Sequence, residues 1–380
     1  MPPVILPGSF LAILRRLLPV FTAPSSVNFV VLVAGFVHAL GGHRLTDALR
    51  AAGPAATKHY TTYYRFFSHA RWSLDELGLL LIALIIELME MAGGVVELVL
   101  DDTLANRTGK KVALAGMHAD PLLKRKSHGR LFMSYGHVFV VLAVHIKVPA
   151  LGETGWALPV MFRLFEGKSQ GGRDDSPSDL RRRKKRRDQK KVTRTRQRMT
   201  DREVVDGQVR RCAHKPNDGP LPDTVRPKKT ELGTELILLV AKRFPKVQFR
   251  VLADHLYNGR SVLHAVLSEV DNFQDCKQKL CVENPQTQLP TAVRRSVPFG
   301  MLLYSLVVFW YVTVGHREAA QFAPRLADPW YARDGRPSFS EMLAALRRIG
   351  WQERLLDPPS GVPPRQEVWA DYQARVVAAA

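Results

Sequence analysis

The 380-residue sequence predicts an α/β protein whose N-terminal region is entirely helical. Residues 1–94 carry the start and stop signals of helices. From residue 95 onward, runs rich in β-branched and aromatic residues are separated by turn residues, and one segment with helical spacing lies among them. Because 46% of the residues are hydrophobic, the chain can bury a substantial core, and its length suggests about two or three domains.

The N-terminal region is expected to form several short helices. Residues 45–52 form one helix, which Pro54 ends, and residues 57–67 form the next. Ser73 and Glu76 have the spacing of a capping box, which predicts the start of another helix. Several cations are distributed among these helices: Arg44, Arg50, Lys58, Arg65 and Arg71. They fit a module that binds DNA ends and equally a plain helical bundle, so both interpretations stay open.

Three strands are predicted after residue 94. Residues 95–100 are rich in β-branched side chains and stop at Asp101-Asp102, which predicts a central strand that ends in acid. Residues 129–147 and 156–165 predict the second and third strands. If the first strand continued, Asp102 would face away from Asp101, so Asp102 is interpreted as structural.

A helix and a fourth strand follow the third strand along the chain. Residues 231–244 have apolar residues at helical spacing and are followed by Pro245, so they are predicted to form a helix. Residues 247–253 are predicted to form a strand whose last residue adjoins Asp254. An acid therefore follows both the first and the last predicted strand.

Asp101 and Asp254 are candidate metal ligands. A carboxylate at the end of a buried strand is costly unless it is paired or binds a cation. Two such strand ends side by side would offer hard oxygen ligands suited to Mg²⁺ or Mn²⁺. In a basic protein the simplest use is two-metal phosphoryl transfer, with both aspartates as ligands rather than proton carriers. Strand-terminal aspartates also cap helices and turns, so this alternative stays open.

A dense basic run separates the third strand from the following helix. Residues 181–198 contain twelve Lys or Arg and one Asp, and so carry +11 of the net charge of +20. Such a run is expected to be a solvated loop that binds a polyanion through phosphate contacts. Nuclear targeting or RNA binding produces a similar composition, so the run does not single out DNA. The candidate DNA contacts in it are Arg181, Arg182, Arg183, Lys184, Lys185, Arg186, Arg187, Lys190 and Lys191.

Targeting and cysteine patterns favour a cytoplasmic protein without a membrane partner. The first residues lack the basic start and continuous apolar core of a signal peptide, and three cysteines fit neither a disulfide framework nor a zinc site. The apolar runs at 29–40 and 77–86 are too short to span a bilayer. The run at 297–315 is of borderline length and carries polar side chains, so it is predicted to be a buried helix.

Four motifs resemble bacterial insertion-sequence transposases with a DDE catalytic domain. They are ELVLDDTLANRTGKK at 97–111, RVLADHLYNGR at 250–260, FQDCKQKL at 273–280 and PWYARDGRPSFSEMLAALRR at 329–348. The resemblance implies a ribonuclease-H-like mixed sheet flanked by helices, which cuts transposon ends and joins them to target DNA with two Mg²⁺ or Mn²⁺ ions. Asp101 matches the first family aspartate and Asp254 the second. Lys277 matches a family lysine that would approach DNA phosphate.

The resemblance also implies a division into domains and a set of partners. Residues 1–94 would bind DNA ends, residues 95–355 would form the catalytic domain with a basic loop at about 168–230, and residues 356–380 would form a tail. The partners would be double-stranded DNA of transposon ends and target, further copies of the chain, and intact relatives. The protein would act at the bacterial nucleoid.

The third carboxylate of the family is missing from its usual position. Val270 stands where the family has Glu, and the nearest acid is Glu269, whose side chain would be turned by about 100° if the segment were a helix. The 15 residues from Asp254 to Glu269 are also fewer than the family interval, which contains a helix, a strand and a β-rich insertion. An internal deletion is our hypothesis for both departures. Glu341 and Glu318 are the other acids considered as substitutes.

Two functions follow from these features. The leading one is a DDE transposase that acts through Asp101, Asp254 and, as the third ligand, Glu269. The alternative is a catalytically inactive DNA-binding remnant that occupies transposon ends or inhibits intact relatives. A general nucleic-acid-binding protein would explain the basic run but not the acids at the strand ends.

Overall fold

The computed structural model describes residues 3–40, 44–90, 95–109, 112–119, 133–151, 155–166, 227–253, 280, 288–322 and 337–356. The helices and strands of these segments belong to one compact unit, which is formed by Met1–Phe165 and Pro227–Ala380. The second unit, Glu166–Arg226, contains the basic run at 181–198, which lies outside the described residues.

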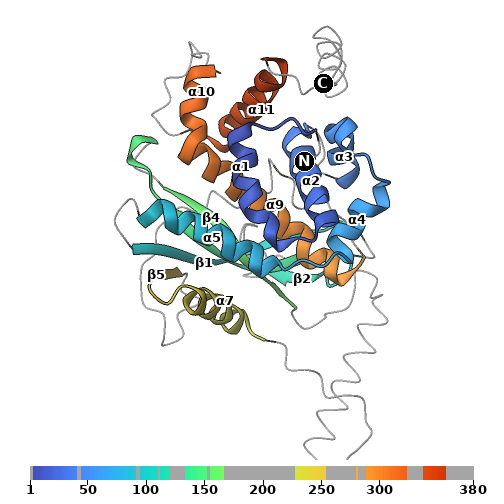
Figure 1. Cartoon of the computed structure of the whole chain (residues 1–380). Helices are drawn as coiled ribbons and strands as arrows, with labels where there is room; N and C mark the ends of the chain where they lie inside the picture. Colours follow the sequence, from blue (N-terminus) through green and yellow to red (C-terminus); the bar gives the residue numbers. More distant parts are fainter. Residues whose placement is uncertain are drawn as a thin grey trace, which may run out of the picture. The chain divides into compact units, whose positions relative to one another are not determined.

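A mixed sheet of five strands forms the centre of the first unit (Figure 1). β3 lies between β1 and β4 and is antiparallel to both, while β5 is parallel to β1 on its other side. The short β2 pairs with the first residues of β3. The strands are β1 (Val95–Asn106), β2 (Gly116–Ala119), β3 (Met133–Ile146), β4 (Trp156–Phe165) and β5 (Gln248–Ala253). The order β4-β3-β1-β5, with helices against the sheet and a helical N-terminal region, confirms the predicted ribonuclease-H-like α/β fold class.

β1 is longer than the sequence predicts. The strand is expected to stop at Asp101, but its pairing with β3 continues from Asp101 opposite Val141 to Asn106 opposite Gly136. β3 supplies backbone partners along this whole length, and Thr103 is buried, so two acids in succession do not end the strand. Asp101 therefore lies within β1 rather than at its end, which corrects the prediction.

The helices that precede the sheet agree with the all-helical prediction. They are α1 (Gly8–Leu17), α2 (Ala23–His38), α3 (Leu45–Ala52), α4 (Tyr60–Ser68) and α5 (Leu74–Glu90). Ser73 Oγ accepts a hydrogen bond of 3.2 Å from the backbone N–H of Glu76, so the predicted cap of α5 is present. Single turns of 3₁₀ helix lie at Leu18–Val20, Gly53–Ala55 and Pro149–Leu151.

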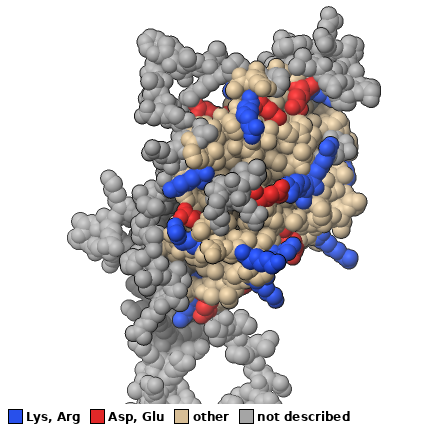
Figure 2. Space-filling model, turned by 60° about the vertical axis from the view of Figure 1, so that its left-hand side comes forward, with Lys and Arg blue, Asp and Glu red and all other residues tan. Residues whose placement is uncertain are grey.

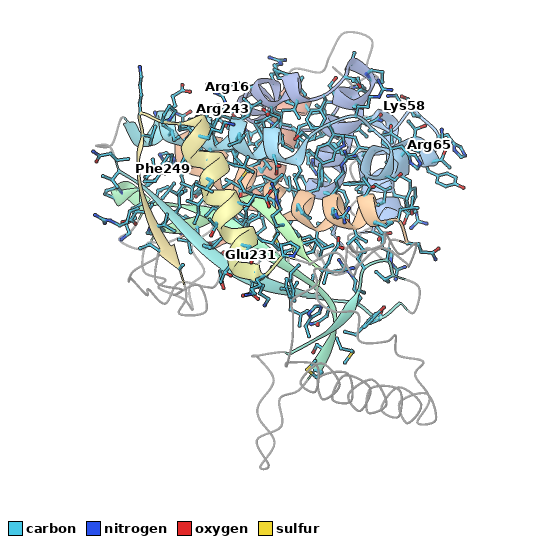
Figure 3. All side chains as sticks on the ribbon, turned by 90° about the horizontal axis from the view of Figure 1, so that it is seen from below. Arg16, Lys58, Arg65, Glu231, Arg243 and Phe249 are labelled. Carbon is cyan, nitrogen blue, oxygen red and sulfur yellow. The ribbon has the colours of Figure 1, made fainter. Side chains whose placement is uncertain are left out.

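The later helices complete two layers around the sheet. They are α7 (Lys229–Arg243), α9 (Pro290–Trp310), α10 (His316–Phe322) and α11 (Phe339–Leu356), with a π-helical turn at Tyr311–Gly315 between α9 and α10. α7 lies on one face of the sheet, and α1, α5 and α9 lie on the other (Figure 1). Viewed from below, α7 crosses the sheet from Glu231 near its start to Arg243 at its end (Figure 3).

α9 is the buried helix that the sequence predicts around 297–315. Within the described residues, Pro290–Gln321 is the one helical stretch long and apolar enough to cross a membrane, and 78% of its most apolar window is buried inside the protein. The Ser305 hydroxyl donates a 2.7 Å hydrogen bond to the carbonyl oxygen of Pro159 in β4. The ring of Tyr304 packs on Phe339 of α11, with 4.7 Å between centroids. α9 thus connects the sheet to the outer helices.

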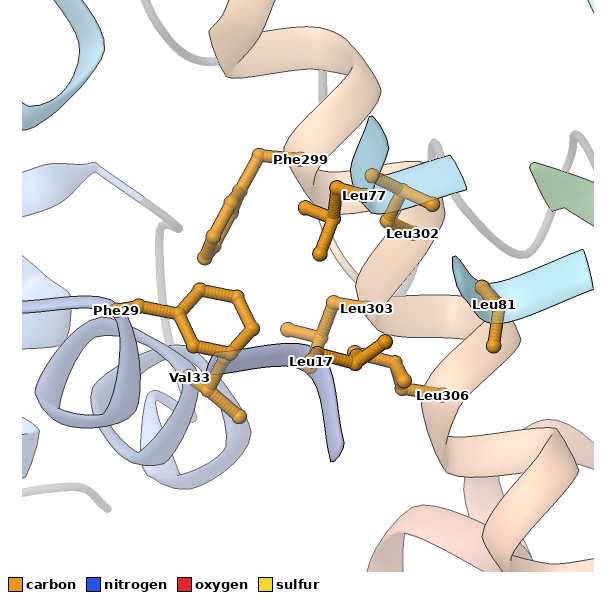
Figure 4. Close-up of a pocket in the computed structure, with 9 residues that line it drawn as sticks. All are labelled: Leu17, Phe29, Val33, Leu77, Leu81, Phe299, Leu302, Leu303 and Leu306. Atoms are coloured by element: carbon orange, nitrogen blue, oxygen red, sulfur yellow. The ribbon is translucent and has the colours of Figure 1, made fainter. Parts of the chain in front are cut away.

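The helical layer packs directly on β4. At Gly78 of α5, a Cβ atom would lie 2.2 Å from the carbonyl oxygen of Val160, so the close approach of helix and strand requires glycine. A small cavity remains between α1, α2, α5 and α9 (Figure 4), and its lining is apolar, with Phe29, Leu81 and Phe299 among the side chains. Such a lining offers no ligand for a metal or an anion, so this cavity belongs to the core and not to a functional site.

Arg163 of β4 joins the two helical layers. Its guanidinium donates to both carboxylate oxygens of Asp75 in α5, at 2.7 and 2.9 Å. It also donates to Glu235 Oε1 in α7, at 3.0 and 2.9 Å. Although burial acts to lower it, the pKa of Arg163 is raised, because these hydrogen bonds to two carboxylates stabilise the cation.

Candidate active site

Asp101 lies in β1, an inner strand of the sheet between β3 and β5. In the parallel pairing of β1 with β5, Leu100 lies opposite Ala253. Leu100 directly precedes Asp101 in the chain, and Ala253, the last residue of β5, directly precedes Asp254. Asp254 itself lies outside the described residues. The register thus aligns the two segments that lead into the candidate acids.

A polar contact at the start of β1 supports this register. Glu97 accepts hydrogen bonds from Arg250 of β5 at 3.0 Å and shares one of 2.9 Å with His145 Nδ1 of β3. Both residues are its direct partners in the strand pairing. The hydrogen bond with His145, together with the charge and hydrogen bond of Arg250, holds the pKa of Glu97 below its usual value, although burial opposes this. One carboxylate therefore contacts both neighbouring strands three residues before Leu100.

Asp101 and Asp102 have different surroundings. Side chains of adjacent strand residues point to opposite faces of a sheet. Asp102 Oδ2 lies 2.5 Å from Lys229 Nζ at the start of α7, so Asp102 faces the α7 layer and Asp101 the opposite side. Lys229 Nζ also lies 5.5 Å from the ring centroid of Phe165, the last residue of β4. Asp102 therefore has the structural surroundings that the sequence suggests for it.

The carboxylate of Asp101 is oriented by its own backbone. Asp101 Oδ1 accepts a hydrogen bond of 2.7 Å from the N–H of Asp102, and the side chain is partly exposed. Because Lys229 holds the Asp102 side chain on the other face, the Lys229–Asp102 pair and this N–H together constrain Asp101. A partly exposed carboxylate held in one orientation can serve as a metal ligand.

Lys229 and His118 are neighbours of the site that the sequence does not single out. Burial and the nearby Lys229 cation lower the pKa of His118, while a hydrogen bond with the carbonyl of Gly136 and the charge of Asp102 act in the opposite direction. Lys229 is 127 residues from Asp102 in the chain. No local motif marks such a contact, since it exists only when α7 packs on the sheet.

A buried Arg–His pair lies at the far end of β1. Arg107, 4% exposed, donates from Nε to Nδ1 of His137 at 3.1 Å, and His137 Nε2 lies 2.7 Å from the carbonyl oxygen of Ala113. Nδ1 must accept, so His137 is the neutral tautomer with its proton on Nε2. Burial, aided by the Arg107 charge, lowers the pKa of His137 to about 4. This pair attaches the end of the Asp101 strand to β3.

Several predicted site residues lie outside the described residues. They are Asp254, Glu269, Lys277 and the basic side chains of the run at 181–198. Of the substitute acids, Glu341 accepts hydrogen bonds from the N–H and hydroxyl of Ser338 as a cap of α11, at 2.7 and 3.0 Å. Glu318 accepts a hydrogen bond of 2.7 Å from Ser9 Oγ of α1. Both acids thus have contacts in the helical layer. The described part of the chain contains no group of three His, Cys, Asp or Glu that could hold a metal ion.

Comparison with known proteins gives one match. The family model described as DDE superfamily endonuclease matches residues 16–272, which is more than half of the chain. The matched region includes the N-terminal helices from α2 onward, the whole sheet and Asp101. It ends before the motifs at 273–280 and 329–348. Neither the search of curated proteins nor that of solved structures returns a match.

Proposed function

The chain belongs to the DDE superfamily endonucleases, and from this premise we propose that it is a transposase of the insertion-sequence type. In this role it cuts the ends of its element and joins them to target DNA by phosphoryl transfer. Asp101 and Asp254 are the proposed metal ligands. The observation that carries the proposal is the register of β1 and β5, in which Leu100 and Ala253, the residues before the two aspartates, lie opposite each other.

The donor set fits a hard divalent cation. Nucleases of the superfamily generally use divalent metals, and carboxylate oxygens are the ligands that Mg²⁺ and Mn²⁺ prefer. Adjacent parallel strands lie about 4.8 Å apart, so carboxylates that follow paired residues can bind the same ions. If the chain is active, Glu269 is the nearest acid for the third ligand, although it is offset by one helical position from the family Glu. Metal bound at these carboxylates would activate the attacking water or 3′-hydroxyl and stabilise the leaving oxygen, as two-metal sites do.

The residues around Asp101 keep its carboxylate oriented. The N–H of Asp102 donates to Asp101 Oδ1, which limits rotation of the side chain. Asp102 itself is neutralised by Lys229 at 2.5 Å, so it adds little negative charge to the site. In this arrangement Asp101 acts as a ligand, and Asp102 and Lys229 support it.

Double-stranded DNA is the proposed partner, and the basic run is its proposed main contact. The described surface carries Lys and Arg interspersed with Asp and Glu on the face drawn in Figure 2. The run at 181–198, in contrast, has a net charge of +11 in 18 residues. Phosphate contacts release counterions, so binding should weaken steeply with salt. Lys277, the N-terminal region at 1–94 as a module for DNA ends, and assembly of several copies on DNA at the nucleoid belong to the same proposal.

A catalytically inactive remnant is the second candidate function. Val270 stands where the family has its Glu, and the interval from Asp254 to Glu269 is 15 residues. An internal deletion would account for both. Sequencing of sibling copies of the element tests this point, because intact copies should carry an additional segment after the second aspartate. Sibling copies of the same length would rule out a deletion.

A cleavage assay separates the two candidates. The full chain is incubated with Mg²⁺ or Mn²⁺ and labelled DNA that carries the element's own ends. For an active transposase, Asp101→Asn and Asp254→Asn should each reduce cleavage by about three orders of magnitude or more. Glu87→Gln is the control, since it makes the same carboxylate-to-amide change at an exposed acid of α5 that pairs with Arg16 of α1, and it should retain most of the activity. Binding without cleavage in the unaltered protein would establish the remnant, and equal cleavage by all variants would refute the assignment of the site.

A further inference from the structure

The outer face of α4 combines exposed aromatic rings with unopposed positive charge. Between Asp47 and Asp75 the sequence has four Lys or Arg residues and no acid. Tyr60 and Tyr64 lie one helical turn apart on α4 and are 54% and 45% exposed. They are the exposed large aromatic residues of the described part of the chain, where the other exposed large hydrophobic side chains are not aromatic.

The two rings lie close enough to form one surface. The ring centroids of Tyr60 and Tyr64 are 6.2 Å apart in an edge-to-face arrangement, and the ring of His59 lies 4.3 Å from that of Tyr60. Arg65 follows Tyr64 and is exposed. The ion pairs among the described residues do not include Arg65 or Arg71. We call Tyr60, Tyr64, Arg65 and Arg71 the α4 surface.

The α4 surface rests on a rigid base. The inner side chains of α4, Tyr63 and Phe66, are buried in the helical layer. Lys58 Nζ donates to Asn28 Oδ1 of α2 at 2.7 Å and so attaches the start of the helix. At the other end, Arg295 of α9 donates to the carbonyl oxygen of Ala70 at 2.9 Å. Aromatic groups that are already fixed lose little conformational entropy when they bind a partner.

We propose that the α4 surface binds DNA and stacks unpaired bases at or beside the cleaved end. Exposed aromatic rings next to cations are the combination that contacts single strands, because each base has a π-face and each nucleotide a phosphate. Residues 48–74 contain no acid, whereas an ordinary protein surface carries both charges. The positive charge of this surface therefore favours DNA, a polyanion, as its partner. Lys58 and Arg65 lie on the opposite side of Figure 3 from Phe249 of β5, and α4 packs mainly against the helices α2, α3 and α9 rather than against β1 or β5.

This inference rests on the proposed function only in taking DNA as the substrate, and its test needs no catalysis. Binding is measured by fluorescence anisotropy with the full chain in EDTA, using a blunt duplex and the same duplex with a single-stranded thymidine overhang. Tyr60→Ala/Tyr64→Ala should raise the Kd for the overhang duplex about tenfold or more and that for the blunt duplex less than about twofold. Arg65→Gln should weaken both and reduce the slope of log K against log salt by about one.

A control variant outside the α4 surface shows whether the effect on DNA binding is specific. Leu238→Ala, at an aliphatic side chain of α7 that is 62% exposed, should change neither Kd, and the melting temperature of the tyrosine variant should stay near that of the unaltered protein. Equal effects of the tyrosine variant on both DNAs, or no effect on either, would overturn the proposal. Loss of self-association in that variant without DNA, seen by sedimentation velocity, would overturn it in favour of a contact between copies. If Asp101→Asn did not reduce cleavage, the proposed active site would be refuted, but the conclusion on DNA binding by the α4 surface would not be affected.

Discussion

Replacing His137 by Gln should remove much of the protein's loss of stability between pH 7 and pH 5. His137 is neutral in the folded protein because burial, helped by the Arg107 cation, lowers its pKa from 6.5 to about 4. The unfolded chain therefore takes up the proton first as the pH falls. Stability is full above about pH 6.5 and declines as the pH falls toward 4.

The size of this effect follows from the shift in pKa. A fall from 6.5 to about 4 corresponds to about 3–4 kcal/mol, at roughly 1.4 kcal/mol for each pKa unit. Between pH 7 and pH 5 the loss attributable to His137 is about 2 kcal/mol. Groups that do not interact with His137 change the stability in the unaltered protein and in the variant alike, so the difference between the two pH dependences reports His137 together with its interaction with the nearby His118.

Urea denaturation at several pH values measures this difference. Each protein is compared with itself at two pH values, so any constant destabilisation by the substitution cancels. The unaltered protein should lose about 2 kcal/mol more than His137→Gln on going from pH 7 to pH 5. Equal losses in the two proteins would refute the argument, as would an NMR titration in which the His137 ring titrates near 6.5 in the native state.

Three further substitutions test how the sheet is held between its layers. Arg163→Met should lower the free energy of unfolding by about 2 kcal/mol, since the carboxylates of Asp75 and Glu235 lose their common partner. Arg163→Lys should lose less stability than Arg163→Met, but more than none. If urea denaturation showed almost no loss for Arg163→Met, this expectation would be wrong. Gly78→Ala should cost about 3 kcal/mol, because its Cβ would meet the Val160 carbonyl at 2.2 Å; a melting temperature equal to that of the unaltered protein would refute the close approach. Lys229→Met should lower the free energy of unfolding by about 1–2 kcal/mol. In a double-mutant cycle with Asp102→Asn, the effects of the two substitutions should not add; additive effects would mean that the Lys229–Asp102 ion pair is not formed.

Local sequence patterns determine which segments are helices and which are strands. The 45–52 helix and the 156–165 strand occur at the predicted residues, and the cap at Ser73 is present. These features depend on the spacing of hydrophobic residues and on side chains that are only a few residues apart, and both can be read directly from the sequence. The order along the chain of the four predicted strands, with a helix before the last one, also belongs to this level, whereas the short strand β2 at Gly116–Ala119 is not predicted.

Tertiary structure decides the length of β1 and the surroundings of its acids. β1 continues through Asp101 because β3 provides backbone partners beside it, and a neighbouring strand is invisible to a local pattern. The contact of Asp102 with Lys229 joins residues 127 positions apart. The alignment of Leu100 with Ala253 likewise depends on the parallel pairing of two strands far apart in the chain. The sequence by itself thus determines the acids and the elements that carry them, whereas only chain packing determines which face each acid takes and which residues it meets, because contacts between distant segments form only when the layers assemble.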